Sequence, residues 1–201
     1  VIDALKAGKP ARVAAPDAAN KDAAKAYKML QLLTAKPELY VCNVDEDSAA
    51  SGNAFSEKVF EKAKAEGASA VIISAAIESE VAQLESEDEK KEFLSALGLE
   101  ETGLSKIIRA GYDLLGLQTY FTAGPKEVRA WTFIKGSKAP QCAGIIHSDF
   151  ERGFIRAETI AYDDFVKFGG EQACKEAGKM RSEGKDYIVQ DGDLLNFLFN
   201  V

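Results

Sequence analysis

Residues that build metal sites and disulfides are scarce in this sequence. Its 201 residues include three cysteines and one histidine. Cys42, Cys142 and Cys174 lie far apart, form no Cys-x-x-Cys pair and are odd in number, so neither a zinc site nor a disulfide framework is expected. We therefore interpret the cysteines as reduced, mostly buried thiols of a cytoplasmic protein.

Long apolar runs are also missing. No stretch approaches the roughly 20 apolar residues that span a bilayer, and residues 1–12 lack the apolar segment of a signal peptide. We expect a soluble protein with no membrane partner. Because the sequence opens on Val1, in a segment that resembles the middle of a helix, we also expect it to be part of a longer polypeptide.

Positive charge is in deficit. The chain has 25 basic and 32 acidic residues, a net charge of -7 and a pI near 4.9. This balance argues against a protein that holds nucleic acid through an overall positive field, and against sequence-specific DNA binding. A local basic face is still compatible with it.

The phosphate-binding loop Gly-x-x-x-x-Gly-Lys-Ser/Thr is absent from the sequence. Its Gly-Lys pairs lack the following hydroxyl residue, because Pro10, Met180 and Asp186 stand there. Without that loop the chain has no nest of backbone amides for a triphosphate and no hydroxyl ligand for Mg²⁺. We expect this chain by itself to be unable to hydrolyse a nucleotide.

The first half of the chain is patterned as a parallel α/β protein. With 46% hydrophobic residues the chain can bury a core, and residues 17–34 have helical spacing behind Asp17 or Asn20 as N-cap. A strand, a helix and a second strand with short connections then predict a parallel sheet. These segments are residues 38–43, 53–68 and 69–76, and two further helices are expected at 78–99 and 103–116.

The second half is patterned differently. We expect a hairpin around Ala123-Gly124-Pro125, a strand at 153–162, a helical stretch at 163–180 and a final hairpin around residues 191–193. Strands at both ends with a helix between them predict an α+β module. We therefore place a domain boundary near residue 117.

Two strands of the predicted parallel sheet end in residues that suit a nucleotide base. The first ends in Asn43-Val44-Asp45-Glu46 and the second in Ser74-Ala75-Ala76. Ligands of such sheets bind beyond the carboxyl ends of the strands, where an amide and a carboxylate can pair with a purine edge and small residues admit the ring. The alternative is a pair of polar turns, because Asn and Asp follow many strands.

Two other groups of residues are candidates for chemistry. His147 lies near Asp149 and Glu151, as a general base does. No nucleophile motif accompanies it, and a histidine that caps a helix or hydrogen-bonds within the second half of the chain is favoured. Trp131 lies among basic residues, as in RNA-binding strands. Alternation places Arg129, Trp131 and Phe133 on one face of a strand, and either face can be the core.

At these residues the chain resembles the YchF family of Obg-like ATPases, among the translation-factor-related P-loop GTPases. Four segments of the second half carry the most specific likeness: YFTAGPKEVRAWTF, APQCAGIIHSDFERGFIRAETIAYDD, EAGKMRSEGKDYIVQDGD and the ending FNV. Upstream, LLTAKPELYVCNVDED, VIISAAIESE and GLSKIIRAGYDLLGLQTYFTAG are similar to the same family. The resemblance runs essentially from end to end.

The resemblance implies three regions. Residues 1–36 correspond to the end of an inserted helical region, 37–116 to the carboxy-terminal half of a G domain with a Rossmann-like three-layer sheet, and 117–201 to a β-grasp TGS domain. It also implies ATP as nucleotide, with Mg²⁺, in a full-length parent that holds the phosphate loop.

The same resemblance assigns the base site. In GTPases the base is read by Asn-Lys-x-Asp, and this chain has Asn43, Val44, Asp45 and Glu46 instead. Loss of the lysine and a longer final acid remove the geometry that pairs with guanine. Base-contacting residues are then expected to be Asn43, Val44, Glu46, Ser74, Ala75 and Ala76.

The family binds ribosomes, which implies that residues 117–201 contact ribosomal RNA or protein. The candidate contacts are basic residues of this region: Lys126, Arg129, Lys135, Lys138, Arg152 and Arg156. The alternative hypothesis is a non-catalytic adaptor that binds RNA or protein through the TGS domain and has a vestigial nucleotide site. An independent hydrolase that uses His147 is the least favoured alternative.

Overall fold

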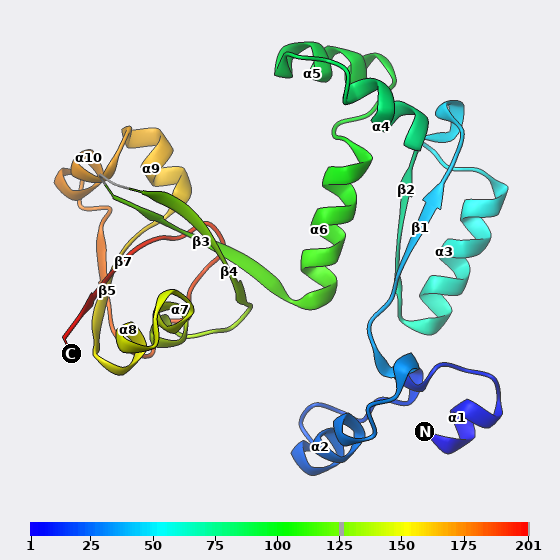
Figure 1. The fold of residues 1–201 in the computed structure, drawn as a ribbon, viewed down its shortest axis with the longest axis horizontal. Helices are drawn as coiled ribbons and strands as arrows, with labels where there is room; N and C mark the ends of the chain where they lie inside the picture. The colour runs from blue at the N-terminus through cyan, green and yellow to red at the C-terminus, as the bar shows by residue number, and fades with distance from the viewer. Residues whose placement is uncertain (125–126, 201) are drawn as a thin grey trace. The chain divides into compact units, whose positions relative to one another are not determined.

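The computed structural model describes residues 1–124 and 127–200. The chain divides into two compact units, Val1–Leu115 and Gly116–Val201, here called unit 1 and unit 2 (Figure 1). Unit 1 contains a two-stranded sheet with helices, and unit 2 contains a five-stranded sheet with short helices.

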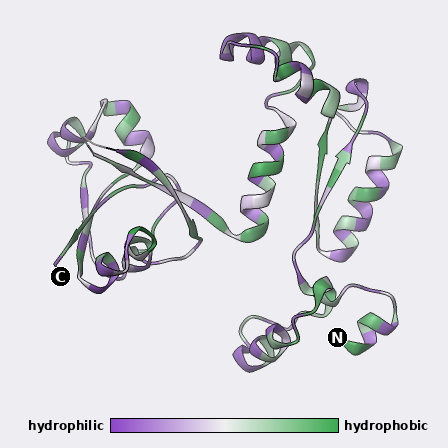
Figure 2. Ribbon diagram, viewed as in Figure 1, coloured by the Kyte–Doolittle hydropathy of each residue, from purple (hydrophilic) through white to green (hydrophobic). Residues whose placement is uncertain are grey.

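The sheet of unit 1 is parallel, as predicted. Strand β1 (Leu39–Asn43) pairs with β2 (Ser69–Ile73) from Leu39 opposite Ser69 to Asn43 opposite Ile73. Their residues are mostly apolar, and Figure 2 shows both strands largely in the hydrophobic colour. Helix α3 (Ala54–Glu66) connects the two strands. It begins with a capping box between Asn53 and Ser56 and ends at Gly67, whose positive φ of 65° suits a residue without a side chain.

Helix α6 (Gly103–Leu115) packs on the same two strands as α3. The two helices lie on opposite sides of the sheet, which gives three layers (Figure 1). The first turn of α6 approaches β2 closely, because a Cβ atom added to Gly103 would lie 2.8 Å from a methyl carbon of Ile73. This layered parallel sheet confirms the α/β class predicted for this part of the chain.

The other helices of unit 1 are shorter than the sequence pattern predicts. Helix α2 (Lys21–Met29) ends at Met29 instead of continuing to residue 34, because Gln31 adopts a positive φ of 48°. The expected cap at its start is confirmed, since the Asn20 side chain accepts the Ala23 N–H. The stretch 78–99 forms two helices, because Ser86 starts a new one with its own capping box. The other helices of unit 1 are α1 (Ile2–Lys6), α4 (Ala75–Val81) and α5 (Glu87–Ala96), with 3-10 turns at Ala11–Ala14, Leu33–Ala35 and Glu46–Ser48.

A charged cluster holds the start of the chain against the sheet. Arg12 forms ion pairs with Glu38, just before β1, and with Glu66, at the end of α3, where the nitrogen-to-oxygen distance is 2.7 Å. The Tyr40 hydroxyl donates to Glu66 at 2.9 Å, and this hydrogen bond raises the pKa of Tyr40. The Arg12 side chain is only 12% exposed, so the cluster is partly shielded from water.

Unit 2 has a mixed sheet of five strands: β3 (Leu117–Ala123), β4 (Val128–Ile134), β5 (Phe154–Ile160), β6 (Arg181–Glu183) and β7 (Leu194–Phe199). Their order in the sheet is β4-β3-β7-β5-β6. β3 and β7, which are the first and last strands of unit 2 along the chain, are parallel neighbours in the sheet, and the remaining pairs are antiparallel. Helix α7 (Ala139–Ile146) packs on β4 and β5. This arrangement is a β-grasp fold and confirms the α+β module predicted here. The other helices are α8 (Ser148–Arg152), α9 (Tyr162–Phe168) and α10 (Glu171–Glu176).

The core of unit 2 lies between α7 and one face of this sheet. Tyr120, Phe133 and Phe197 pack ring against ring, with centroids 5.8 Å apart in both Tyr120 pairs. The Tyr120 hydroxyl is buried but donates to the Cys142 carbonyl at 2.9 Å, and burial raises its pKa. Each buried polar group of this contact therefore has a partner.

The prediction of a final hairpin around residues 191–193 is wrong. Strand β7 pairs instead with β5 and β3, and residues 186–190 contribute one isolated bridge, between Ile188 and Lys138. Asp193, only 2% exposed, accepts hydrogen bonds from the Tyr187 hydroxyl and the Gln190 N–H and so fixes a tight turn. After that turn the chain enters the middle of the sheet as β7, which pairs with β3 on one side and with β5 on the other.

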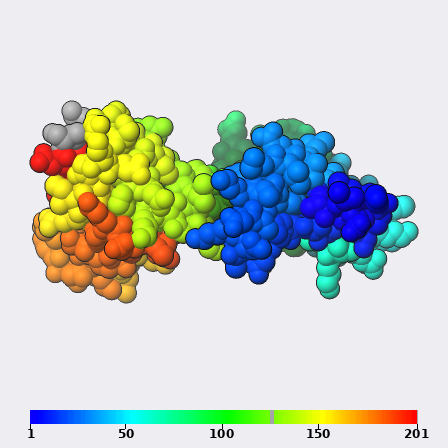
Figure 3. Space-filling view, turned by 90° about the horizontal axis from the view of Figure 1, so that it is seen from below, coloured from blue at the N-terminus to red at the C-terminus, as the bar shows by residue number. Residues whose placement is uncertain are grey.

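The helical stretch predicted at 163–180 is two short helices, α9 and α10. Gly169 and Gly170 separate them with φ values of 80° and 141°, which favour glycine. Helix α9 packs against α10, and their residues, orange in Figure 3, form a continuous part of the surface of unit 2. The hairpin expected at 123–125 is present as β3 and β4, while Pro125 lies outside the described residues.

Candidate functional site

The ends of β1 and β2 meet at one edge of the unit 1 sheet. Asn43 lies opposite Ile73, and the Val44 N–H donates to the Ile73 carbonyl at 2.9 Å. Parallel pairing therefore continues one residue beyond β1. The two turns that the sequence marks as base-contacting, at 43–46 and 74–76, are neighbours for this reason.

The Asn43 side chain joins the two turns directly. Its Oδ1 atom accepts the Ala75 N–H at 2.9 Å across 32 residues of sequence. The oxygen is therefore committed to the second turn, and the Nδ2 amide hydrogens are left as donors on an exposed side chain.

The second turn is built from small residues at the start of α4. Ser74 is 3% exposed, and its hydroxyl has no partner among the described residues. Ala75 and Ala76 occupy the first turn of the helix and are exposed. The N–H groups of a first turn are unsatisfied within the helix; that of Ala75 binds Asn43, and the methyl side chain leaves that of Ala76 accessible.

The acidic end of the first turn is placed less closely. Asp45 precedes a 3-10 turn, Glu46–Ser48, and Glu46 is exposed at its first position. An open hollow of about 450 Å³ runs along β1 and the start of α3, lined by Asn43, Val44, Asp45 and Phe55 among others. Glu46 does not line this hollow, and neither do residues 74–76. The structure thus brings Asn43, Val44 and Ala75 together and leaves Glu46 and Ala76 beside them.

Glu78 holds the second turn in place, a role that sequence reasoning missed. From the first turn of α4 its carboxylate accepts the N–H groups of Gly103 at 2.6 Å and Leu104 at 3.1 Å. A carboxylate at a helix N-terminus satisfies two orphan donors and complements the helix dipole. No local pattern marks this contact, because 25 residues separate Glu78 from Gly103.

The sequence leaves open which face of β4 in unit 2 lies in the core, and the structure shows which one does. Phe133 is 2% exposed in the core, so Arg129 and Trp131 lie on the core face of the strand. The Trp131 ring packs against that core, its Nε1–H donates to the Thr122 hydroxyl at 2.9 Å, and the Arg129 guanidinium lies 4.0 Å from the ring centroid. Trp131 is therefore mainly a structural residue with a cation covering it.

The other basic candidates are spread over unit 2, and most lie near a carboxylate. β4, which carries Arg129, is separated from β5, which carries Arg156, by two strands. Lys135 is exposed and has no ion-pair partner within the described part of the chain, and Lys126 lies outside the described residues. The paired candidates are Arg129 with Glu127 (3.8 Å), Lys138 with Asp186 (2.7 Å), Arg152 with Asp149 (2.5 Å) and Arg156 with Glu158 (3.6 Å).

His147 is a helix cap. Its Nδ1 atom accepts the Asp149 N–H at 3.1 Å at the start of α8, so the interpretation as a capping residue is confirmed. The Cys142 thiol is buried, and burial raises its pKa to about 12. A buried, protonated thiol is a poor nucleophile, so this region offers no support for an independent hydrolase.

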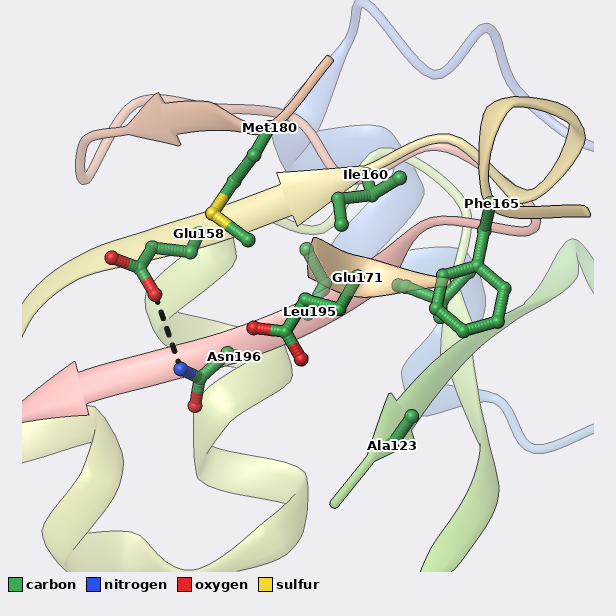
Figure 4. A pocket seen from close by; sticks show the side chains of 9 residues that line it. Ala123, Glu158, Ile160, Phe165, Glu171, Met180, Leu195 and Asn196 are labelled. Carbon is green, nitrogen blue, oxygen red and sulfur yellow. Dashed lines mark hydrogen bonds between the residues drawn. The ribbon is translucent and has the colours of Figure 1, made fainter. Parts of the chain in front are cut away.

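A small cavity lies beneath α9 and α10 (Figure 4). Apolar side chains such as Ile160, Phe165 and Met180 form its wall, and the Asn196 amide donates to Glu158 at 3.2 Å at its rim. Its volume is about 20 Å³. That space holds one water molecule and no larger ligand.

Neither a membrane-spanning helix nor a metal-binding cluster of side chains occurs in residues 1–124 and 127–200. No helix in these ranges is long and apolar enough to cross a membrane. Nor do three or more His, Cys, Asp or Glu side chains in the same ranges gather where they could hold a metal ion.

Known proteins resemble this chain over its whole length. A family model described as "YchF-GTPase_C: Protein of unknown function (DUF933)" matches residues 117–200. A Bacillus subtilis (strain 168) protein named "Ribosome-binding ATPase YchF" is 57% identical over 201 residues, which is 99% of this chain and 54% of that relative. The Escherichia coli O157:H7 protein of the same name is 58% identical over 88% of this chain and 48% of its own length.

Solved structures resemble the chain as well. The structure of the Schizosaccharomyces pombe YchF GTPase matches with a TM-score of 0.80 and 35% identity, covering 96% of this chain and 50% of that one. A GTP binding protein from Pyrococcus horikoshii OT3 shares the fold, with a TM-score of 0.57 and 20% identity over 89% of this chain and 49% of its own. The chain spans about half the length of the curated relatives that it matches.

The contact between Glu78 and α6 predicts a measurable loss of stability. Glu78→Ala leaves two helix N–H groups without an acceptor, so the free energy of unfolding should fall by about 1 to 2 kcal/mol. Urea unfolding followed by circular dichroism measures it. The matched control is Glu80→Ala on the exposed side of the same helix, expected to stay within about 0.5 kcal/mol. Equal stability of the two variants would contradict the assigned role of Glu78.

Proposed function

Because the chain belongs to the YchF family, we propose that it supplies the base-recognition part of an ATP site in a ribosome-associated ATPase. One observation carries the proposal: Asn43 Oδ1 accepts the Ala75 N–H, which joins the ends of β1 and β2 into one surface. Relatives that span about twice this length are named ribosome-binding ATPases. The activity itself belongs to that longer protein.

The chemistry of the side chains suits a purine. Position N7 of adenine is an acceptor and its 6-amino group is a donor. With Oδ1 of Asn43 committed to Ala75, its Nδ2–H groups are the donors for N7. The exposed first turn of α4 offers the Ala76 N–H to the same ring, because the Ala75 N–H already binds Asn43.

Preference for adenine over guanine is assigned to Val44 and Glu46. Guanine needs an acceptor placed for its N1–H and 2-amino groups, and the longer Glu46 side chain at the end of Asn43-Val44-Asp45-Glu46 does not present its carboxylate as an aspartate does. Val44, half-buried, offers an apolar contact to the ring where GTPases have a lysine.

The phosphates and Mg²⁺ are assigned to the remainder of the full-length protein. Residues 1–124 and 127–200 contain no cluster of metal-binding side chains, and the sequence has no phosphate loop. When bound, Mg²⁺ would neutralise phosphate charge, and the residues of this chain would act only on the base.

Ribosome association is assigned to unit 2. Relatives carry "Ribosome-binding" in their names, and residues 117–200 match the family model. Among the basic candidates Lys135 is the best placed, because it is exposed and the described residues give it no carboxylate partner. Under the adaptor hypothesis, unit 2 binds its partner and the full-length protein binds neither ATP nor GTP.

The base assignment is tested by changing Val44 and Glu46 together in the full-length protein. The double variant Val44→Lys, Glu46→Asp should move the ratio of ATP to GTP affinity toward GTP by at least about tenfold, which is about 1.4 kcal/mol. Equilibrium titration with both nucleotides measures the ratio. Asp47→Asn, an exposed neighbour outside the assigned set, is the control and should leave it unchanged. An unchanged ratio in the double variant would remove Val44 and Glu46 from the site, and a wild-type protein that binds neither nucleotide would favour the adaptor.

The ribosome assignment is tested by charge removal. Lys135→Ala should weaken co-sedimentation of the full-length protein with ribosomes. The slope of the logarithm of the affinity against the logarithm of the salt concentration should fall in magnitude by about 1, as expected for one lost phosphate contact. Lys175→Ala, an exposed lysine of α10, is the control. If both variants sediment like the unmodified protein at every salt concentration, Lys135 is not part of the contact.

A further inference from the structure

Residues 1–36, here called the N-terminal segment, bury very little apolar surface. The structure describes all of these residues, and among them only Ala11 is buried. Most of the large apolar side chains of the segment are exposed, for example Met29 at 74% and Leu33 at 80%. The buried cluster of unit 1 is formed by side chains from residues 49–99. Apolar packing therefore contributes little to holding the segment in place.

The N-terminal segment closes into a loop just before β1. The Ala11 N–H donates to the Thr34 hydroxyl at 3.1 Å, which joins two stretches that lie 23 residues apart in the sequence. Lys36 then leaves the loop in an extended conformation, with a φ of -66° and a ψ of 144°, as expected for the residue before Pro37. Residues 36–38 are therefore a short link between the closed loop and the sheet. Figure 1 shows the segment in blue beyond the start of β1.

The Arg12 side chain bridges this link. Its guanidinium group pairs with Glu38, just before β1, and with Glu66, at the end of α3. Among the described residues, these two are the ion pairs between the N-terminal segment and the rest of unit 1. The planar guanidinium has several N–H donors and can serve two carboxylates at once. A single side chain thus provides the charged contact between the segment and the sheet.

Two polar atoms of the segment oppose this arrangement. Arg12 Nε and the Tyr27 hydroxyl are enclosed and have no hydrogen-bond partner within the described part of the chain. An enclosed polar atom without a partner costs free energy, and water would remove that cost if the segment moved away. A region with little apolar packing and such opposing contacts opens locally while the rest of the protein stays folded.

We propose that Arg12, Glu38 and Glu66 form a clamp that opens and closes, with residues 36–38 as its hinge. In the closed form the clamp holds residues 1–35 against the sheet. In the open form the Arg12 guanidinium leaves both carboxylates, and residues 1–35 move away as one body. Because the contact is ionic, added salt favours the open form.

Both carboxylates can exist without Arg12. Glu66 keeps the hydrogen bond from the Tyr40 hydroxyl, whose length is 2.9 Å. Glu38 is 44% exposed, so water can solvate its charge. The open form therefore leaves no enclosed carboxylate without a partner.

The clamp lies at the opposite end of β1 from the candidate base site. Arg12 meets the sheet where β1 starts and α3 ends, whereas Asn43 binds Ala75 where β1 ends. Opening therefore leaves the two turns of the base site joined. The inference goes beyond the proposed function and does not depend on it.

Distances between spin labels test the clamp in the full-length protein. Labels at Lys28→Cys on α2 and Lys58→Cys on α3, with the other accessible cysteines changed to serine, report the position of the segment by double electron–electron resonance. We expect two distance populations, of which the larger is the closed form. Arg12→Gln should raise the ratio of open to closed form by at least about tenfold. Lys9→Gln, an exposed lysine of the same segment, is the control and should leave the ratio unchanged.

Salt and a double-mutant cycle identify the charges. Raising NaCl from about 0.05 to 1 M should raise the ratio by at least about threefold in the protein with native Arg12 and leave it unchanged in Arg12→Gln. Glu66→Gln should raise the ratio by itself and add nothing to Arg12→Gln, because each variant removes the same contact.

Three results would overturn the proposal. The first is an Arg12→Gln variant with the ratio of the control, and the second is a double variant whose effect is the product of the two single effects. The third is a ratio independent of salt in the protein with native Arg12, a measurement that decides the question even where a variant does not fold.

Discussion

The parallel pairing of β1 with β2 is the constraint on which the candidate site depends. It brings Asn43 level with Ile73, and the Val44 N–H extends it by one hydrogen bond. Only with this register can Asn43 Oδ1 reach the Ala75 N–H. Helices α3 and α6 hold the two strands from opposite sides, and Glu78 fixes the start of α6 beside the same edge. A slip of one residue would turn Asn43 to the other face of the sheet and separate the two turns.

Unit 2 depends on a different contact, the buried carboxylate of Asp193. By accepting the Tyr187 hydroxyl and the Gln190 N–H, it turns the chain into the centre of the sheet, where β7 lies between β3 and β5. Burial and, after it, the hydrogen bond to Asp193 raise the pKa of Tyr187, so the hydroxyl stays protonated and donates. With β7 in the middle, β4 and β6 are the two outermost strands of the sheet.

The sequence predicted the fold class and the elements whose signals are local. Helix α3 has a capping box and a terminal glycine, and β1 and β2 are uninterrupted apolar runs, so their limits were close to those observed. The misplaced elements depend on distant partners. β7 was assigned to a hairpin because Asp191-Gly192-Asp193 has the composition of a hairpin turn, whereas its pairing with β5 and β3 comes from burial in the centre of the sheet. The role of Glu78 could not be predicted for the same reason, because its partner Gly103 is 25 residues away. The capping role of His147 could be predicted, because its partner Asp149 is two residues away.

The central claim is that the Asn43 side chain, anchored on Ala75, donates to N7 of a purine. The most direct measurement compares ATP with 7-deaza-ATP, which lacks that nitrogen, by equilibrium binding to the full-length protein. The account predicts that 7-deaza-ATP binds about tenfold more weakly, one lost hydrogen bond to the base, and that Asn43→Ala removes the difference. Equal affinity of the two nucleotides for the unmodified protein would contradict it.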